Sequence, residues 1–127
     1  MYVLDTYALI EIINENPKFQ KYKSFFPNKI FIASTTFAEF YVIINERSKD
    51  KNELMQITNP FRQFIKEINT DIFIEAILFR KNHNKQTKGN MSFFDSVGYI
   101  FALKNNYLFL TGDKEFKSLP NVEFIEK

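Results

Sequence analysis

The sequence is short of the residues on which many enzymes and extracellular proteins depend. Its 127 residues include no cysteine, no tryptophan and a single histidine, His83. The absence of cysteine excludes disulfides, thiolate metal sites and a cysteine nucleophile, and one histidine cannot form a paired-histidine zinc motif. The net charge is only +2, so any nucleic-acid footprint must be local. Any chemistry must rest on carboxylates, hydroxyls, basic side chains and, where a metal takes part, a hard ion.

Long apolar runs are also missing. No run reaches the roughly 20 residues that a membrane-spanning helix needs. The first residues lack the basic region of a signal peptide and are interrupted by Asp5 and Glu11. We therefore expect a soluble cytoplasmic protein that does not enter a membrane. The length is that of one domain, residues 1–127, with a substantial core.

Short apolar runs alternate with segments of helical periodicity. Strands are predicted at residues 2–4, 30–33, 107–110 and 122–125, with either a short strand or a continued helix at 65–68. Helices are predicted at residues 8–13, at 18–26, after a cap at 34–36, at 54–64 with an interruption at Pro60, from 70–71 to a polar helix end and loop at 80–89, and from 92 to 105–106. This alternation predicts an α/β fold, with a three-layer α/β/α sandwich around a mainly parallel sheet of four or five strands.

The stretch from residue 92 to residue 116 organises the rest of the chain. Ser92 begins a capping pattern at the start of a helix, and Gly98 inside that helix allows it to approach a sheet closely. The asparagine pair at 105–106 can end the helix, since asparagine tolerates the left-handed conformation. The apolar run 107–110 is typical of a strand buried on both faces, and an acidic turn follows it.

Four acidic residues lie where predicted strands end or helices begin, and each has an ordinary structural explanation. Asp5 can cap the first helix. Glu39 follows Thr36 by three residues, as in a capping box, and Asp95 stands at the same spacing after a serine. Asp113 suits a turn. Taken singly, none of the four acids indicates a functional site.

Together the four acids predict a metal site. The carboxyl ends of parallel strands meet at one edge of a sheet, where ligands bind, so we expect all four to lie there. Carboxylates a few ångströms apart repel each other strongly, and a divalent cation relieves that repulsion. Ligand sets made only of oxygen select Mg²⁺ or Mn²⁺. The chemistry expected of such a site is phosphodiester hydrolysis.

Four segments resemble, in order and spacing, the motif blocks of PIN domains, which are small metal-dependent ribonucleases. The segments are LDTYALIE, TTFAEF, SFFDSVGYIFALKNN and LFLTGDKEF, and they span nearly the full chain. The resemblance implies an endoribonuclease whose catalytic acids, which also bind Mg²⁺ or Mn²⁺, are Asp5, Glu39, Asp95 and Asp113. It implies supporting roles for Thr6, Thr111 and Glu115. Tyr7 replaces a small residue that is frequent in the family, and its ring is expected to narrow the site.

A single-domain chain of this length resembles the VapC-type toxins of type II toxin–antitoxin pairs. This resemblance implies an RNA substrate and a small antitoxin partner. A homodimer is also expected, because residues 36–64 hold more Phe and Ile than one modest core needs. A housekeeping RNA-processing nuclease and a non-catalytic PIN-like binding module remain as alternatives. A dehalogenase-like phosphatase is disfavoured, because it needs a second aspartate where Tyr7 stands.

A basic stretch without acids precedes the helix that Asp95 opens. Its cationic members are Arg80, Lys81, Lys85 and Lys88. They would hold RNA phosphates or, equally well, form a solvated helix end where cations suit the helix dipole. His83 lies among them and is expected to be exposed and without a role.

Overall fold

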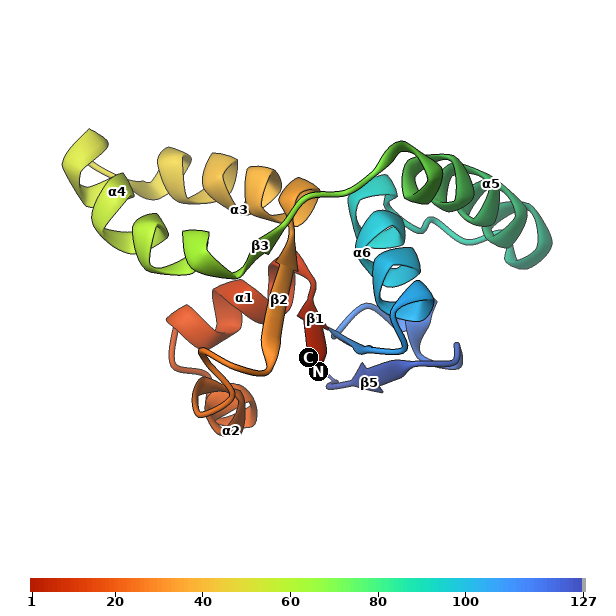
Figure 1. Cartoon of the computed structure of the whole chain (residues 1–127), viewed down its shortest axis with the longest axis horizontal. Coiled ribbons are helices and arrows are strands. Elements are labelled where there is room, and N and C mark those ends of the chain that lie inside the picture. The colour runs from red at the N-terminus through yellow and green to blue at the C-terminus, as the bar shows by residue number, and fades with distance from the viewer. Residues whose placement is uncertain (127) are drawn as a thin grey trace.

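The computed structural model describes residues 1–126, and Figure 1 shows how the elements are arranged. The strands are β1 (Tyr2–Leu4), β2 (Ile30–Ala33), β3 (Ile65–Lys66), β4 (Leu108–Thr111) and β5 (Val122–Phe124). The α-helices are α1 (Thr6–Ile13), α2 (Gln20–Lys23), α3 (Ser34–Arg47), α4 (Lys51–Thr58), α5 (Thr70–Thr87) and α6 (Phe93–Lys104). Three 3-10 helices, Pro17–Phe19, Asn59–Phe64 and Lys114–Phe116, complete the described secondary structure.

The five strands form one sheet in the order β3-β2-β1-β4-β5, and all neighbouring pairs are parallel. The central strand β1 pairs Val3 with Phe31 on one side and with Phe109 on the other. The prediction of an α/β fold around a parallel sheet is therefore confirmed. The short strand suggested at residues 65–68 is also present, as β3.

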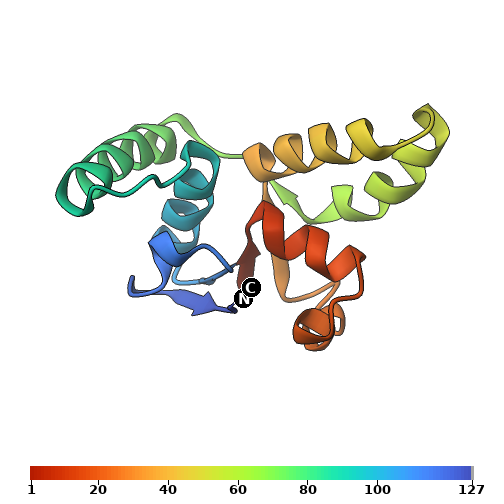
Figure 2. The ribbon, with the colours of Figure 1, turned by 180° about the vertical axis from the view of Figure 1, so that it is seen from behind.

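Alternate strand residues point into two separate cores, one on each face of the sheet. Leu4 and Leu110 pack with α1 to α4, whereas Val3 and Phe109 pack with α5 and α6. Figures 1 and 2 show the same division, with α1 to α4 on one side of the strands and α5 and α6 on the other. The three-layer sandwich is confirmed. Within residues 1–126, no helix is both long enough and apolar enough to span a membrane.

The helix α6 lies close against the sheet, as Gly98 predicted. A Cβ atom at Gly98 would come within 3.0 Å of Phe109 Cε1 on β4. The Ser92 hydroxyl caps the helix by accepting a hydrogen bond of 3.1 Å from the backbone N–H of Asp95. At the other end Asn106 adopts a φ of 57°, the left-handed conformation expected of the asparagine pair. Phe94 differs from expectation, because it is 39% exposed rather than part of the buried face.

Several predicted helices have different bounds, and the helix expected at 54–64 is α4 (Lys51–Thr58) followed by the 3-10 helix Asn59–Phe64. The helix expected at 18–26 ends at Lys23, and the chain then turns so that the Phe25 ring stacks on Tyr2, with ring centroids 5.1 Å apart. The helix expected to end near residue 80 runs to Thr87, and Lys88 closes it with a φ of 53°. Its N-cap is Asn69, one residue before the predicted pair at 70–71.

Candidate active site

Asp5 is the most buried of the four acids, with 2% of its surface exposed. It follows β1 directly and caps α1, since its Oδ1 accepts a hydrogen bond of 2.7 Å from the backbone N–H of Ala8. Its Oδ2 accepts a second bond, of 2.5 Å, from the hydroxyl of Thr111 at the end of β4. The capping prediction for Asp5 is confirmed. These two hydrogen-bond donors offset the desolvation cost of burying the Asp5 carboxylate at the edge of the sheet.

Thr111 connects Asp5 with Asp113. Its hydroxyl donates to Asp5 and also accepts a hydrogen bond of 3.0 Å from the backbone N–H of Asp113. The Asp113 carboxylate in turn accepts a bond of 3.0 Å from the backbone N–H of Glu115. One fully buried hydroxyl therefore ties the acid after β1 to the acid after β4.

Glu39 is delivered by α3 in a different way from the predicted capping box. The helix begins at Ser34, directly after β2, and its N-cap, Ala33, makes no side-chain hydrogen bond. Thr36 is a buried residue of the first helical turn rather than a cap. Glu39 accordingly lies within the second turn and is only partly exposed. The capping explanation of Glu39 is wrong, so the alternative to a functional role for this acid loses its support.

All four acids line one pocket at the carboxyl ends of the strands, which we call the acid pocket. It has a volume of about 360 Å³, and its lining residues are Asp5, Thr6, Tyr7, Ile10, Glu39, Ile43, Asp95 and Asp113. The acids come from four segments far apart in the sequence. Among residues 1–126, however, no three Asp, Glu, His or Cys side chains converge closely enough to form a ready-made metal-binding group.

The side chains of the acid pocket fit a hard cation in donor chemistry. Every ionisable group that lines it is a carboxylate, apart from the Tyr7 phenol, and oxygen donors are the ligands that Mg²⁺ and Mn²⁺ prefer. In addition, Thr6 Oγ1 is buried and has no hydrogen-bond partner among the described residues. A buried hydroxyl without a partner is unfavourable in the protein alone, and a ligand or an ordered water in the pocket would satisfy it.

Tyr7 forms an aromatic wall of the acid pocket. Its ring packs so closely on Gly112 that a Cβ atom there would lie 2.7 Å from Tyr7 Cε1. It also meets Phe19 edge to face, with centroids 5.8 Å apart. Burial, followed by the nearby carboxylates of Glu11 and Asp5, raises the pKa of Tyr7, so the phenol stays protonated at neutral pH. The position of this ring agrees with the expectation that it narrows the site.

The fold and the sequence match a known protein family. The model of the PIN domain family aligns with residues 2–122, which is nearly the whole chain. The chain belongs to the PIN domain family. PIN domains are typically nucleases and generally use Mg²⁺. No curated protein matches the sequence at a significant level.

Solved structures of toxin–antitoxin systems share this PIN fold. A toxin–antitoxin complex from Klebsiella pneumoniae superposes with a TM-score of 0.80 and 18% identity over 100% of both chains. DNA-bound VapBC from Salmonella typhimurium gives 0.77 and 15%, over 98% of this chain and 96% of that one. VapC20 from Mycobacterium tuberculosis, described as a sarcin-ricin loop cleaving toxin, gives 0.73 and 13%, over 100% and 98%. Identities this low show a common fold, and the activity of this PIN domain must be argued from its own residues.

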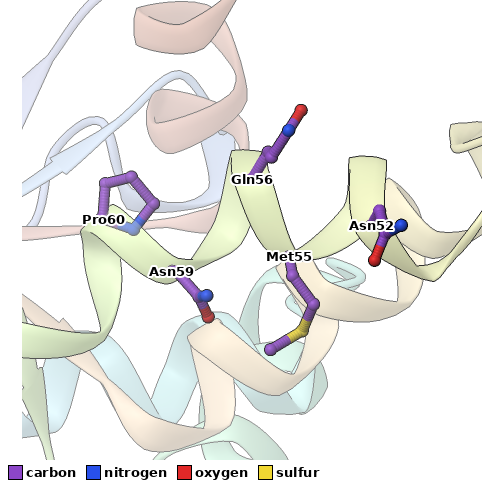
Figure 3. Close-up of a pocket in the computed structure, with 5 residues that line it drawn as sticks. All are labelled: Asn52, Met55, Gln56, Asn59 and Pro60. Carbon is purple, nitrogen blue, oxygen red and sulfur yellow. The ribbon is translucent and has the colours of Figure 1, made fainter.

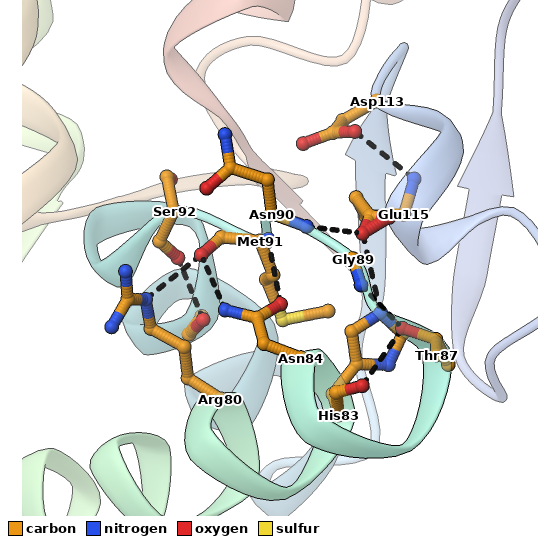
Figure 4. A network of polar contacts seen from close by, with 11 residues as sticks. Arg80, His83, Asn84, Thr87, Gly89, Asn90, Met91, Ser92, Asp113 and Glu115 are labelled. Atoms are coloured by element: carbon orange, nitrogen blue, oxygen red, sulfur yellow. Dashed lines mark hydrogen bonds and ion pairs between the residues drawn. The ribbon is translucent and has the colours of Figure 1, made fainter.

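Glu115 was expected in a supporting role. It is not among the described residues that line the acid pocket. Its carboxylate turns toward the end of α5 and lies near His83 and Asn90 (Figure 4). His83 is not the exposed residue that the sequence indicated, because only 13% of its side chain is accessible. Sequence reasoning missed this cluster, in which Glu115 lies 25 residues after Asn90 and 32 after His83, so that no periodic pattern links its members.

The four basic residues of α5 and its end have different surroundings. Arg80 Nε donates a hydrogen bond of 2.8 Å to the carbonyl oxygen of Met91, so Arg80 fixes the chain before α6. Lys81, Lys85 and Lys88 are exposed, and the last of them closes the helix in a left-handed conformation. None of the four lines the acid pocket among the residues described. A role in RNA binding therefore stays a prediction for all four residues, and Arg80 in addition makes a structural contact.

A second hollow lies on α4 and the 3-10 helix that follows it. Figure 3 shows its lining side chains, Asn52, Met55, Gln56, Asn59 and Pro60. It contains amides and a thioether, and no carboxylate, histidine or basic group is among them. Amides bind through hydrogen bonds alone and supply neither a charge nor a titratable group. The acid pocket is therefore the one of these two hollows that has the means for hydrolysis.

Proposed function

We propose that this PIN domain is a metal-dependent endoribonuclease and the toxin of a type II toxin–antitoxin pair. The observation that carries the proposal is the acid pocket, where four carboxylates from separate segments meet beside a buried hydroxyl without a partner. A carboxylate cluster is costly for a protein with no cation to neutralise it. A non-catalytic binding module would gain nothing that offsets the repulsion among these carboxylates.

The proposed roles follow from where each acid is held. Asp5, Glu39, Asp95 and Asp113 would hold Mg²⁺ or Mn²⁺. A bound ion of this kind supplies a water of lowered pKa and stabilises negative charge on a phosphate. The Thr111 hydroxyl fixes the positions of Asp5 and Asp113 relative to each other, because it is hydrogen-bonded to both residues. Thr6 Oγ1 offers a further oxygen at the same place.

Cleavage of RNA in the presence and absence of a chelator tests the nuclease proposal. Purified protein should cut RNA in Mg²⁺ or Mn²⁺ and lose that activity in EDTA. The Glu75→Gln variant is a suitable positive control, because Glu75 is an exposed carboxylate on α5 that pairs with Lys104 at 3.0 Å. Cleavage that continues undiminished in EDTA would overturn the metal-dependent mechanism.

The toxin role is supported by the structural relatives, which include toxins crystallised with their antitoxins. A small antitoxin would be recognised by charge, since a basic side chain placed in the acid pocket would neutralise its carboxylates. Expression of the wild-type chain should arrest cell growth, and co-expression of its antitoxin, which we expect to be a small DNA-binding protein encoded in a neighbouring gene, should relieve the arrest. A housekeeping nuclease would cut RNA without arresting growth, and a binding module would do neither.

A further inference from the structure

The Glu115 side chain is the centre of a polar cluster beside the acid pocket (Figure 4). Its Oε1 accepts a hydrogen bond of 2.8 Å from the backbone N–H of Asn90 and lies 3.6 Å from Nε2 of His83. Only 25% of the Glu115 side chain is exposed. The imidazole of His83 is itself stacked on Phe79, with centroids 6.0 Å apart. Glu115 is therefore held on the side of α5, away from the acids.

The cluster joins two segments that each deliver an acid to the pocket. On one side the backbone N–H of Glu115 donates to the carboxylate of Asp113 at 3.0 Å. On the other, its carboxylate holds Asn90, in the segment 88–92 that leads into α6 and its first-turn acid, Asp95. Glu115 is thus bonded directly to Asp113 and to the segment that precedes the helix of Asp95.

The segment 88–92 is fixed from both sides. Asn84 accepts a hydrogen bond of 2.8 Å from the backbone N–H of Met91, and Arg80 Nε donates to the Met91 carbonyl at 2.8 Å. Ser92 then caps α6. These bonds tie the segment to α5, and only the bond from Asn90 to Glu115 ties it to the Asp113 turn among the hydrogen bonds described. Packing of α6 on β4 sets the general distance between these segments, and the Asn90–Glu115 bond is the described hydrogen bond that adjusts the segment before α6 to the Asp113 turn.

We propose that Glu115 is a positioning residue, which sets the placement of Asp95 relative to Asp113 by holding Asn90 while its own backbone N–H orients Asp113. This proposal rests on the proposed nuclease function for its effect on RNA cleavage, but its structural content is independent of it. It also separates Glu115 from the acids, since a positioning role needs only an oxygen acceptor, whereas an acid that neutralises the bound cation acts through its charge.

Gly89 provides a way to break the contact without removing Glu115. A Cβ atom at Gly89 would lie 1.9 Å from Glu115 Oε1 and 2.7 Å from Thr87 Oγ1, and both atoms are ends of side chains that can move aside. Gly89 is not among the residues with a positive φ, so alanine is compatible with its backbone. Gly89→Ala should therefore fold and displace the Glu115 carboxylate from Asn90.

Three variants and a control test the proposal. Glu115→Ala and Gly89→Ala should each lower kcat for RNA cleavage by roughly 10- to 100-fold with little change in KM, because small displacements of catalytic groups have effects of this size. Glu115→Gln keeps an oxygen that can accept from Asn90 and should retain the wild-type rate. Glu75→Gln should match the wild type as well.

Backbone amide NMR spectra without metal supply a readout that does not depend on cleavage. Glu115→Ala and Gly89→Ala should shift the amide signals of both segments, 90–95 and 113–115, while Glu115→Gln and Glu75→Gln leave segment 92–95 unchanged. The chain has one histidine, so the His83 ring signal reports the cluster without ambiguity.

The outcomes separate the two proposals. If the wild type cleaves no RNA and both segments still shift together, the nuclease proposal fails and the positioning role stands. If Glu115→Gln loses as much activity as Glu115→Ala, Glu115 acts through its charge and the positioning role is overturned. The same conclusion follows if Gly89→Ala and Glu115→Ala alter the Asp113 turn alone.

Discussion

Asp95 has two roles that one substitution separates, because it stands in the first turn of α6 and lines the acid pocket. A carboxylate near a helix N-terminus contributes about 0.3–1 kcal/mol. Two carboxylates about 4 Å apart at an effective dielectric near 20 repel by about 4 kcal/mol before relaxation, and even a fraction of that exceeds the helix term. We therefore predict that Asp95→Asn leaves the metal-free protein equally or more stable, abolishes RNA cleavage and reduces the Mg²⁺-induced rise in Tm.

Thermal melts in EDTA and in millimolar Mg²⁺ check this prediction, with Glu75→Gln as the control that removes an exposed carboxylate elsewhere. The Ser92 cap is unaffected by the change, since Ser92 accepts its hydrogen bond from the backbone of residue 95. A destabilised Asp95→Asn protein that keeps both its Mg²⁺ response and its nuclease activity would remove Asp95 from the site.

Thr111 is expected to matter for stability as well as for the acids. Thr111→Val keeps the shape of the side chain but removes the donor to Asp5 and the acceptor for the backbone N–H of Asp113. Leaving buried polar groups without partners costs roughly 1–3 kcal/mol each. We predict a loss of at least that size in the free energy of unfolding, measured by urea titration. Thr111→Ser, which keeps the hydroxyl, should stay close to the wild type, and equal losses in both variants would contradict the explanation.

At the residue scale, the sequence predicted those contacts that depend on near neighbours. Asp5 and Ser92 each cap a helix that begins at the next residue, so local spacing in the sequence determines their capping roles. The capping-box prediction at Thr36 was wrong because α3 begins directly after β2, without a loop. No feature of the sequence indicates that the loop is missing. The contacts of Glu115 depend on how α5 lies against the Asp113 turn, and no local pattern encodes that placement.

Packing of α6 on the sheet depends on Gly98, the position nearest to Phe109. A Cβ atom there would lie 3.0 Å from Phe109 Cε1 and 3.6 Å from Thr36 Oγ1. Gly98→Val adds two further methyl groups in that space, and overpacking typically costs about 1–3 kcal/mol. We predict a lower Tm for Gly98→Val. For Gly98→Ala the loss should be smaller, because alanine gains about 1 kcal/mol in helix propensity over glycine. If Gly98→Val is as stable as the wild type, α6 does not lie as close to Phe109 of β4 as the structure indicates.

The basic end of α5 gives a prediction about RNA. Lys85 and Lys88 are exposed and pair with no acid in the described ion pairs. Replacing both with alanine should weaken RNA binding and reduce the log–log salt slope by about one unit for each phosphate that the lysines no longer neutralise. Filter-binding titrations over a range of salt concentrations measure the slope. If the slope does not change, RNA binds elsewhere on the protein.

At the scale of elements, the positions of strands and helices were predicted better than their ends. The apolar runs mark the strands because both faces of the sheet are buried. The polar stretch at 80–89 predicts a helix end that runs into a loop, yet α5 continues to Thr87, and Arg80 and Asn84 direct their polar groups to the Met91 backbone. Polarity alone therefore did not indicate a break. The early end of α2 likewise depends on a tertiary contact, the stacking of Phe25 on Tyr2.

For the whole molecule, parallel topology explains why separated acids could be placed together from the sequence. Strands β1, β2 and β4 are neighbours and run in one direction, so residues that follow them meet at one edge. Asp5, Glu39 and Asp113 follow these three strands, and Asp95 opens the helix that leads into β4. The distances within the acid pocket could not be predicted this way, because they depend on side-chain packing around Tyr7 and Thr111.

The homodimer expected from the sequence stays a prediction, and the exposed apolar side chains suggest where its contact would lie. Within residues 36–64 no Phe or Ile is exposed, since most pack in the core on the side of α1 to α4 and Ile43 lines the acid pocket. Three large apolar side chains on α5 are exposed instead, Ile74 at 52%, Ile77 at 51% and Leu78 at 64%. Their spacing places them on one face of the helix, and an apolar helix face of this kind can pair with its own copy across a two-fold axis. We therefore place the predicted homodimer contact on α5.

Light scattering at micromolar concentration tests the predicted homodimer. The wild type should be a dimer and Leu78→Glu a monomer, because association would bury the new charge without a partner. Val42→Glu is the matched control, since Val42 is similarly exposed, at 56%, but lies on α3 within the stretch that the sequence first suggested. A monomeric wild type would exclude the dimer at that concentration. If Val42→Glu disrupts the dimer and Leu78→Glu does not, the dimer contact lies on α3. The exposed apolar face of α5 would then not be explained by dimer formation.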